Sequence, residues 1–331
     1  MTAPLLEIRN LSVRFPRGRD SFLAVDDVSF DLAPSETLGL VGESGSGKTT
    51  IGRAVLRLLA PGHRGIVGGM RFRDAALSDL RGGALKRFRA EAQMVFQDPV
   101  SSFNPRRTIE RIVAEGLEIQ GLPAAETRDR VDAALAEVGL SRAMVKGRRP
   151  HQFSGGQCQR IAIARALALR PSMLVCDEPV ASLDVSVQAR VLNLLRRMRQ
   201  ARSLGMIFIS HDLAVVRSIC DRVAVMYMGR IVEIGPSAAI FAAPAHPYTR
   251  TLLDAVPVPD ASRKLVPDRA RAARASRLED GGGCAFRGRC ARATGLCTTQ
   301  RPPLAPVPGG HMAACHHPLG AAASAPAPAS A

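Results

Sequence analysis

The chain has 331 residues, 46% of them hydrophobic, which allows two domains or one large domain with an extension. No apolar run reaches the roughly 18 residues that a membrane span needs, and residues 1–10 lack the basic and apolar pattern of a secretory signal. The net charge of +16 is typical of proteins that meet nucleic acid or an anionic membrane face, but coding bias toward arginine and alanine gives the same balance. We therefore predict a cytosolic, globular protein.

The first part of the chain alternates in polarity over residues 6–9, 11–15 and 28–32, which predicts antiparallel strands. Residues 37–41 are continuously apolar apart from Thr37 and Gly39, so we expect a short buried strand there.

A glycine-rich segment follows that strand: Gly42-Glu43-Ser44-Gly45-Ser46-Gly47-Lys48-Thr49-Thr50. It fits G-x-x-x-x-G-K-[ST], a loop whose backbone N–H groups surround phosphates while its lysine reaches the terminal ones. Apolar residues at helical spacing over 51–59 predict a helix behind the loop, so that free amides and the helix dipole both face the ligand. The alternative is a Gly/Ser turn that only caps a helix. The strand, the helix and the Lys-Thr pair together favour a nucleoside triphosphate site.

The middle of the chain is predicted to be helical over residues 108–139 and again over 157–169, with a break at 150–156. Buried strands are expected at 173–176 and 206–209, a helix between them at 185–204, and a final hairpin around Gly229. Strands that alternate with helices indicate a parallel sheet covered on both faces, with the helical block as an inserted subdomain.

Two adjacent carboxylates, Asp177 and Glu178, follow the strand at 173–176. Parallel sheets bind ligands at this end of their strands. Asp177 would hold Mg²⁺ together with the hydroxyl of Thr49, and Glu178 would accept a proton from the attacking water. The alternative is a buried strand that ends in a solvated acidic turn, which the neighbouring P-loop disfavours.

The cysteines fall into two groups. Three lie in apolar segments and are expected to be small buried hydrophobes: Cys158, Cys176 and Cys220. The others crowd into the last fifth of the chain, which in a reducing compartment suggests metal before disulfide: Cys284, Cys290, Cys297 and Cys315. Residues 302–331 are mostly Pro, Ala and Gly, and the end of this stretch is expected to be disordered.

Five further features resemble, in order and spacing, the ATP-binding subunit of an ABC transporter over about residues 5–240. They are Phe15, Gln97, the segment Phe153-Ser154-Gly155-Gly156-Gln157, the segment Ser182-Leu183-Asp184, and His211. The resemblance implies an α/β P-loop NTPase core with an antiparallel β subdomain and an inserted helical subdomain at about 100–165. It divides the chain into an ATP-binding domain at 1–240, a cysteine-containing extension at 241–301 that also includes Cys315, and a disordered tail at 318–331.

The same resemblance implies a role for each matching residue. Phe15 would stack on adenine, with Phe22 as the fallback. Gln97 would complete the Mg²⁺ and water shell, and His211 would hold the γ-phosphate and orient water. Lys48 and Glu178 would act with His211 in catalysis. The residues that would contact ATP bound to a partner subunit, or lie beside it, are Ser154, Gly155, Gly156, Gln157 and Asp184. Cys158 departs from the family, which usually has a basic residue there.

A narrower resemblance, to the di- and oligopeptide importer branch, is carried by residues 97–106 and 184–189 and by His246-Pro247-Tyr248-Thr249. Residues 178–184 are similar to the second of two paired ATPases. The branch also imports nickel chelates and other solutes. Its relatives are thought to hold a [4Fe–4S] cluster on extension cysteines, and four thiolates suit either zinc or iron–sulfur. The absence of a C-x-x-C pair disfavours a zinc ribbon, whereas departures at Ala285, Arg287 and Gly288 weaken the family's cluster pattern.

The branch resemblance also implies the partners. They are two transmembrane permease subunits, a second ATP-binding subunit that is distinct rather than a copy, and indirectly an extracytoplasmic solute-binding protein. The chain would lie on the cytoplasmic face of the bacterial inner membrane and use ATP and Mg²⁺. One rival is an ABC ATPase that acts on nucleic acid or the ribosome, although such proteins usually have tandem ATPase units or a long coiled coil. Another is redox sensing by the cysteines. His311, His316 and His317 are extra ligand candidates, but we expect them to be solvated.

Overall fold

The computed structural model describes residues 3–17, 20–59, 65–181, 183–255 and 282–320. Ser182, most of the segment between the ATPase core and the extension cysteines, and the expected tail from residue 321 onward lie outside the described residues. The predictions made for those positions stay predictions.

A central sheet runs through the molecule, with the strand order β11-β12-β10-β9-β3-β8-β7-β6 among the described residues. Its core is parallel, as predicted. The parallel strands are β9 (Arg222–Tyr227), β3 (Thr37–Val41), β8 (Gly205–Ile209), β7 (Met173–Asp177) and β6 (Ala92–Val95). Strand β3, which precedes the glycine-rich loop, lies between β9 and β8.

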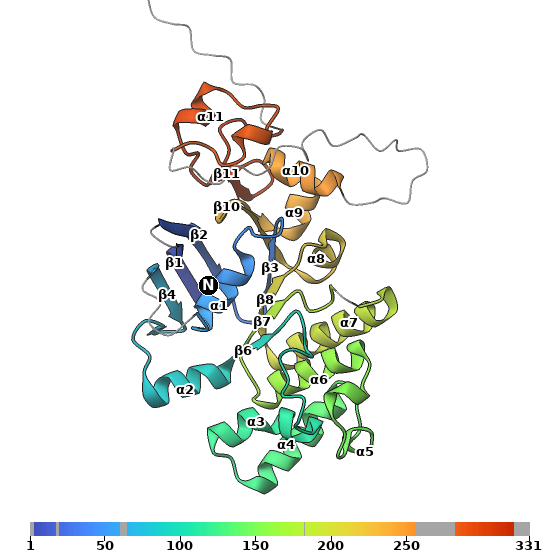
Figure 1. Cartoon of the computed structure of the whole chain (residues 1–331). Helices are drawn as coiled ribbons and strands as arrows, with labels where there is room; N and C mark the ends of the chain where they lie inside the picture. Colours follow the sequence, from blue (N-terminus) through green and yellow to red (C-terminus); the bar gives the residue numbers. More distant parts are fainter. Residues whose placement is uncertain (1–2, 18–19, 60–64, 182, 256–281, 321–331) are drawn as a thin grey trace, which may run out of the picture.

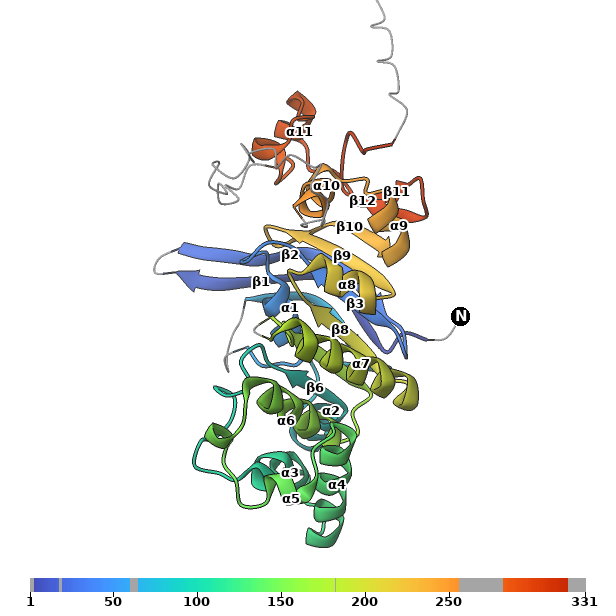
Figure 2. The ribbon, with the colours of Figure 1, turned by 90° about the vertical axis from the view of Figure 1, so that its right-hand side faces the viewer.

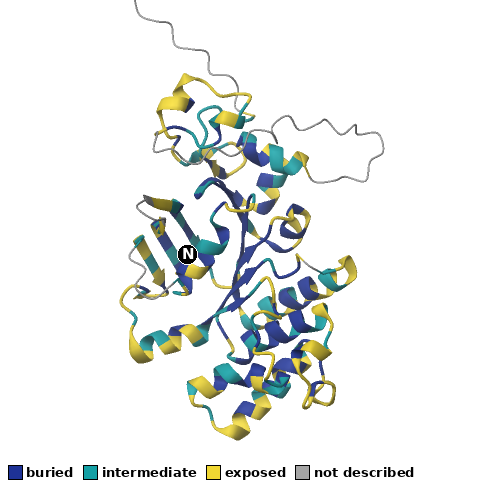
Figure 3. Cartoon of the chain, in the orientation of Figure 1, coloured by how far each residue is buried: buried dark blue, intermediate teal, exposed yellow. Residues whose placement is uncertain are grey.

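The central strands are buried on both faces, and alternate residues supply two separate cores. In β7, Cys176 belongs to one hydrophobic cluster and Val175 to the other; in β8, Phe208 and Ile207 divide in the same way. Successive side chains of a strand point to opposite faces, so a strand covered on both sides must be apolar throughout. This explains the unbroken apolar runs in the sequence and the dark central strands in Figure 3.

One face of the central sheet is covered by helix α1 (Lys48–Val55) and a second sheet, ordered β2-β1-β4-β5. This sheet is antiparallel, which confirms the alternation-based prediction. Its strands are β1 (Leu6–Arg17), β2 (Asp20–Leu32), β4 (Ile66–Phe72) and β5 (Ala75–Ala76). Helix α2 (Gly82–Glu91) connects this sheet to β6.

The opposite face carries α7 (Val185–Arg202) and α8 (Leu213–Ile219) (Figure 1). Below them the helical block gathers at one end of the molecule, away from the C-terminal extension (Figure 2). It contains α3 (Ile109–Gln120), α4 (Ala124–Glu137), α5 (Arg142–Val145), the short 3-10 turn η1 (Pro150–Gln152) and α6 (Gly155–Ala168). The predicted helical stretch over 108–139 is two helices, because Gly121 ends α3 in the left-handed conformation.

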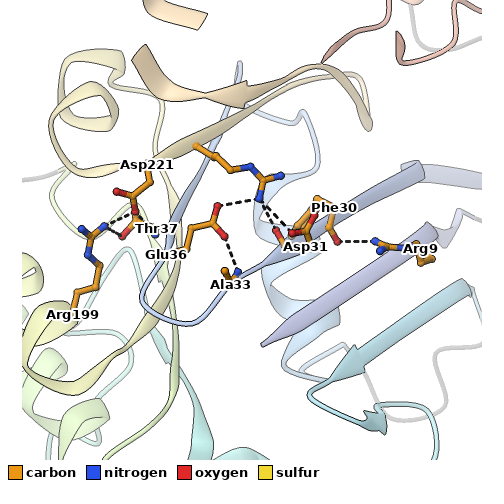
Figure 4. Close-up of polar contacts among 9 residues, drawn as sticks. Arg9, Phe30, Asp31, Ala33, Glu36, Thr37, Arg199 and Asp221 are labelled. Atoms are coloured by element: carbon orange, nitrogen blue, oxygen red, sulfur yellow. Dashed lines mark hydrogen bonds and ion pairs between the residues drawn. The ribbon is translucent and has the colours of Figure 1, made fainter. Parts of the chain in front are cut away.

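Charged side chains fix the start of β3 (Figure 4). Arg199 pairs with Asp221 at 2.5 Å and donates to the Thr37 hydroxyl at 3.0 Å, while the Thr37 N–H donates to Asp221 at 2.8 Å. On the other side of the strand, Arg222 pairs with Glu36 at 3.0 Å. These bonds tie β3 to the elements around it, and so determine where the following loop begins.

The C-terminal extension continues the central sheet. The antiparallel strands are β10 (Arg230–Pro236), β12 (His311–Ala313) and β11 (Ala305–Val307). Around them lie α9 (Ser237–Ala242), α10 (Pro247–Asp254), η3 (Arg287–Arg289) and α11 (Gly295–Thr299). The Pro/Ala/Gly-rich composition after residue 301 gave no strand signal, yet β12 pairs with β10.

The predicted α/β P-loop class, with its antiparallel and helical additions, is confirmed. No helix in the part of the chain that the structure describes is long and apolar enough to cross a bilayer.

Candidate functional site

The glycine-rich loop is tightly packed against neighbouring backbone. Gly42 (φ +149°) and Gly47 (φ +101°) lie in conformations that side-chain-bearing residues rarely adopt. A Cβ at Gly42 would lie 2.2 Å from the Met226 carbonyl oxygen, and one at Gly47 would lie 2.5 Å from that of Ala24. Ser44 and Gly45, in contrast, are exposed at the crown of the loop. The glycines therefore let the loop curl back against β9 and β2.

Lys48 lies inside the curve of the loop. Its Nζ donates to the carbonyls of Gly42 and Glu43, both at 2.8 Å, and to the Ser46 hydroxyl at 3.2 Å. The side chain is buried, and desolvation lowers the pKa of the amine, although the carboxylates of Glu178, Asp177 and Glu43 act in the opposite direction. The ammonium thus sits where a loop-bound phosphate would meet it.

An oxygen pair suited to Mg²⁺ lies beside the loop. The Thr49 hydroxyl, at the start of α1, donates to Asp177 Oδ1 at 2.9 Å, and Asp177 is 4% exposed at the end of β7. Burial raises the pKa of Asp177, which the Thr49 bond partly counteracts. Hydroxyl and carboxylate oxygens are the donors that Mg²⁺ prefers, so these residues fit the metal. Thr50 follows on α1 and is half-buried.

Glu178 joins two side chains from neighbouring segments. Gln97 Nε2, after β6, donates to Glu178 Oε2 at 3.0 Å, and His211 Nδ1, after β8, lies 3.2 Å from Glu178 Oε1. Glu178 itself has φ +47°, a left-handed conformation that costs about 1–3 kcal/mol for a non-glycine residue and is concentrated at functional sites. Its N–H donates to the Ile209 carbonyl at 3.0 Å, which ties this turn to β8.

The segment from Ser154 to Gln157 begins α6. Ser154 Oγ accepts from the Gln157 N–H at 3.3 Å, and Gln157 Oε1 accepts from the Ser154 N–H at 2.9 Å, which is a reciprocal capping box. Gly156 packs against Val187 of α7, whose N-cap is Asp184. Among the described residues, no hydrogen bond or ion pair links this segment to the glycine-rich loop. Within the described residues, the start of α6 and the glycine-rich loop are therefore separate places on the chain.

These helix starts line a basic groove of about 880 Å³ between α6 and α7. Its lining includes Ser154, Gly156 and Gln157, together with the arginines Arg160, Arg190, Arg196 and Arg197. The sequence did not single out these arginines. The lining also includes Glu137, so the four guanidinium groups leave an excess of positive charge that is suited to an anionic ligand.

Phe15 and Phe22, the adenine candidate and its fallback, face each other across the β1–β2 hairpin. Phe15 is half-buried, whereas Phe22 is 47% exposed. Because they are cross-strand partners, the two aromatic residues lie next to each other near the end of the β1–β2 pair.

Comparison with known proteins decides the family. A model described as ABC transporter matches residues 25–181, and one described as the oligopeptide/dipeptide transporter C-terminal region matches residues 232–297. A putative peptide import ATP-binding protein of Brucella ovis is 48% identical over 313 residues, which cover 94% of this chain and 97% of that protein. The chain belongs to the ABC transporter ATP-binding proteins. It is thus an ABC-type ATPase.

Other relatives agree with this assignment. The oligopeptide transport ATP-binding protein OppF of Haemophilus influenzae is 43% identical over 325 residues, covering 94% of this chain and 96% of its own. The solved structure of cbiO1 from Clostridium perfringens, part of the ABC transporter complex cbiONQ, has a TM-score of 0.63 and 28% identity, covering 73% of this chain and 92% of its own. A dimeric bacterial ABC transporter cassette, MJ0796, has a TM-score of 0.63 and 25% identity, covering 70% and 98%.

The cysteines of the ABC ATPase divide as the sequence predicted. Cys158, Cys176 and Cys220 are buried, and desolvation raises the pKa of each thiol. The other four line one enclosed pocket of about 10 Å³ in the extension: Cys284, Cys290, Cys297 and Cys315. Burial raises the pKa of Cys284, and that of Cys315 to about 11. Within the described residues, no three His, Cys, Asp or Glu side chains are placed to hold a single metal ion.

The expectation of solvated histidines is wrong for His311. It is 3% exposed, and its Nε2 lies 2.9 Å from Glu233 Oε1 inside the joint between β12 and β10. His316 and His317 are half-buried and line the cysteine pocket. The buried position of His311 gives it a structural contact, away from the cysteines.

Two contacts at the loop escaped the sequence reasoning. The Tyr248 hydroxyl accepts a hydrogen bond from the Glu43 N–H at 2.9 Å, and Arg289 Nη1 lies 2.9 Å from Glu43 Oε2. Both partners belong to the C-terminal extension, about two hundred residues further along the chain. No spacing rule predicts such a contact.

Proposed function

We propose that this ATPase energises the uptake of di- or oligopeptides through a membrane permease. The match of the C-terminal region to the oligopeptide/dipeptide transporter model and the names of the relatives support this substrate class. The observation that carries the hydrolytic part is the convergence of Gln97 and His211 on Glu178 beside the buried Asp177. The C-terminal match also favours a transporter over an ATPase that acts on nucleic acid.

The chemistry follows from the side chains present. Lys48 and the loop amides would bind the β- and γ-phosphates, and Thr49 with Asp177 would hold Mg²⁺, which neutralises phosphate charge. Glu178 would accept the proton of the attacking water, because its carboxylate is half-buried and oriented by two neighbours. His211 and Gln97 would orient that water and the terminal phosphate. Phe15, or Phe22 beside it, would stack on the adenine.

A second subunit would complete the site. The segment from Ser154 to Gln157 is exposed or half-buried at the start of α6, and its resemblance to the family's signature supports its use on ATP held by a partner ATPase. In this proposal the chain pairs with a distinct ATP-binding subunit, and the two ATPases bind two permease subunits in the membrane. An extracytoplasmic solute-binding protein delivers the solute to the permease. The chain would then lie peripherally on the cytoplasmic face of the bacterial inner membrane.

The four extension cysteines would hold a [4Fe–4S] cluster. The support for this is that all four thiols line one pocket and that the C-terminal region matches the oligopeptide/dipeptide transporter model. A cluster takes one thiolate on each of its irons, and it would supply a structural or electron-storing centre. Iron and acid-labile sulfide analysis of anaerobically purified protein tests this, and zinc or no metal would refute it.

The decisive experiment for the ATPase is Glu178→Gln in the assembled transporter. We expect ATP turnover to fall by about 10²-fold or more, since general-base catalysis contributes on that order, while ATP binding is retained. Peptide uptake into vesicles should fall in parallel. Unchanged ATP turnover per complex would refute the assignment of Glu178. Hydrolysis that is stimulated by nickel chelates and not by peptides would refute the peptide substrate alone.

A further inference from the structure

Among the described residues, the hydrogen bonds and ion pairs that join the C-terminal extension to the phosphate-binding loop all involve Glu43. Tyr248 of α10 accepts the Glu43 N–H at 2.9 Å, and Arg289 pairs with the Glu43 carboxylate at 2.9 Å. The Glu43 carbonyl meanwhile accepts from Lys48 Nζ at 2.8 Å. Every polar group of Glu43 is thus engaged, two of the three by the extension, which Figure 1 shows capping this end of the core.

Arg289 is held firmly in place. Its side chain is 11% exposed, and its guanidinium lies 5.8 Å from the ring centroid of Tyr227 and 5.6 Å from that of Phe286. Tyr248 packs on the same two rings, at 4.6 Å and 5.4 Å between centroids. The bond to Glu43 raises the pKa of Arg289, so its charge is permanent. Because the aromatic rings hold the guanidinium in one position, the ion pair fixes the position of the Glu43 carboxylate relative to the extension.

The charge of Glu43 matters because the loop binds phosphates. The Glu43 carboxylate already interacts with the Lys48 amine: it is one of three carboxylates that partly offset the lowering of the Lys48 pKa by burial. A charge that attracts Lys48 repels the phosphates that Lys48 binds. Arg289 supplies the compensating positive charge from outside the loop.

We propose that Arg289 is a positioning residue for the ATPase: it neutralises Glu43 and, with Tyr248, holds the first residues of the phosphate loop in place for ATP. The C-terminal extension is then part of the nucleotide site. This inference depends on ATP binding, which the family shares, and not on the identity of the transported solute or on the state of the cysteine pocket.

A double-mutant cycle on the full-length chain tests the proposal. We measure ATP affinity with a fluorescent ATP analogue for wild type, Arg289→Gln, Glu43→Gln and the double variant. Arg289→Gln should weaken binding about fivefold, or about 1 kcal/mol, whereas Glu43→Gln should bind at least as tightly as wild type. The double variant should recover to within about twofold of wild type, because no unpaired carboxylate remains.

The matched control is Arg301→Gln. Arg301 is also an extension arginine, and it pairs with Asp26 at 3.6 Å and Asp27 at 3.4 Å on β2 instead of with the loop. This control loses the same charge and a similar tether, so its ATP affinity should stay within about twofold of wild type. An equal loss in Arg301→Gln would mean that the net charge of the extension, and not the Glu43 contact, sets affinity.

Two further measurements separate positioning from mere folding. In the assembled transporter, Arg289→Gln should raise KM for ATP and leave kcat nearly unchanged, and Arg289→Lys should restore most of the affinity. If Arg289→Gln does not fold, Tyr248→Phe tests the other anchor: it keeps the ring packing and should weaken ATP binding by removing the acceptor for Glu43. Wild-type affinity in a folded Arg289→Gln, or a double variant as weak as Arg289→Gln, would overturn the proposal.

Discussion

A buried histidine in the extension should make the stability of the protein fall in mild acid. His246 is 1% exposed; its Nδ1 accepts from the Tyr248 N–H at 3.0 Å and caps α10, while its Nε2 has no hydrogen-bond partner among the described residues. Desolvation lowers the pKa of His246 from 6.5 to about 4. At a pH between these two values, His246 is protonated in the unfolded chain and neutral in the folded chain. The free energy of unfolding therefore decreases as pH falls through the unfolded pKa.

The size of the effect follows from the two pKa values. Full protonation of the unfolded state against a neutral folded state corresponds to about 3 kcal/mol, and between about pH 7 and about pH 5 the loss is about 2 kcal/mol. Below the folded pKa of about 4 no further loss from His246 is expected. Urea denaturation at each pH measures the free energy of unfolding directly.

The matched variant is His246→Asn, which keeps a side-chain cap for α10 but does not titrate. Between about pH 7 and about pH 5, its free energy of unfolding should fall by about 2 kcal/mol less than that of wild type. Glu233 accepts the backbone N–H groups of Ala245 and His246 and also faces His311, and the substitution removes none of these groups. An identical pH dependence in wild type and variant would refute the reasoning.

Two further predictions concern the loop and the core. Gly42→Ala should abolish ATP binding, because the new Cβ would lie 2.2 Å from the Met226 carbonyl oxygen. Gly45→Ala is the control, since φ there is also positive (+80°) but no atom lies within 4 Å of the added Cβ. An equal loss of ATP binding in both variants would assign the defect to backbone strain and not to the clash. Phe208→Ala removes a fully buried ring from β8 and should lower the free energy of unfolding, measured by urea denaturation, by about 3–5 kcal/mol. The control is Phe22→Ala: Phe22 is exposed, so the free energy of unfolding should fall far less. Similar losses in the two variants would contradict the assigned core.

The sequence was sufficient wherever the physical cause is local. Uninterrupted apolar runs predicted the buried strands β3, β7 and β8, and alternation predicted the β1–β2 pair. The glycine-rich loop was predicted because its phosphate-binding geometry depends on consecutive backbone amides and a helix that follows at once. Strands β4 and β6 were not predicted, since the first contains two glycines and the second is only four residues long.

Contacts between distant segments were decided by the tertiary structure alone. Glu178 meets Gln97 and His211 only because β7 lies between β6 and β8 in the sheet, so that three strand ends share one edge. The same holds for strand β12, whose short segment is stabilised by pairing with β10, and for the buried His311 within it. Local sequence sets which residues can bind phosphate or water. The packing of the sheet and of the C-terminal extension decides which of them meet, because an ion pair between Arg289 and Glu43 depends on where two elements dock and leaves no periodic trace in either.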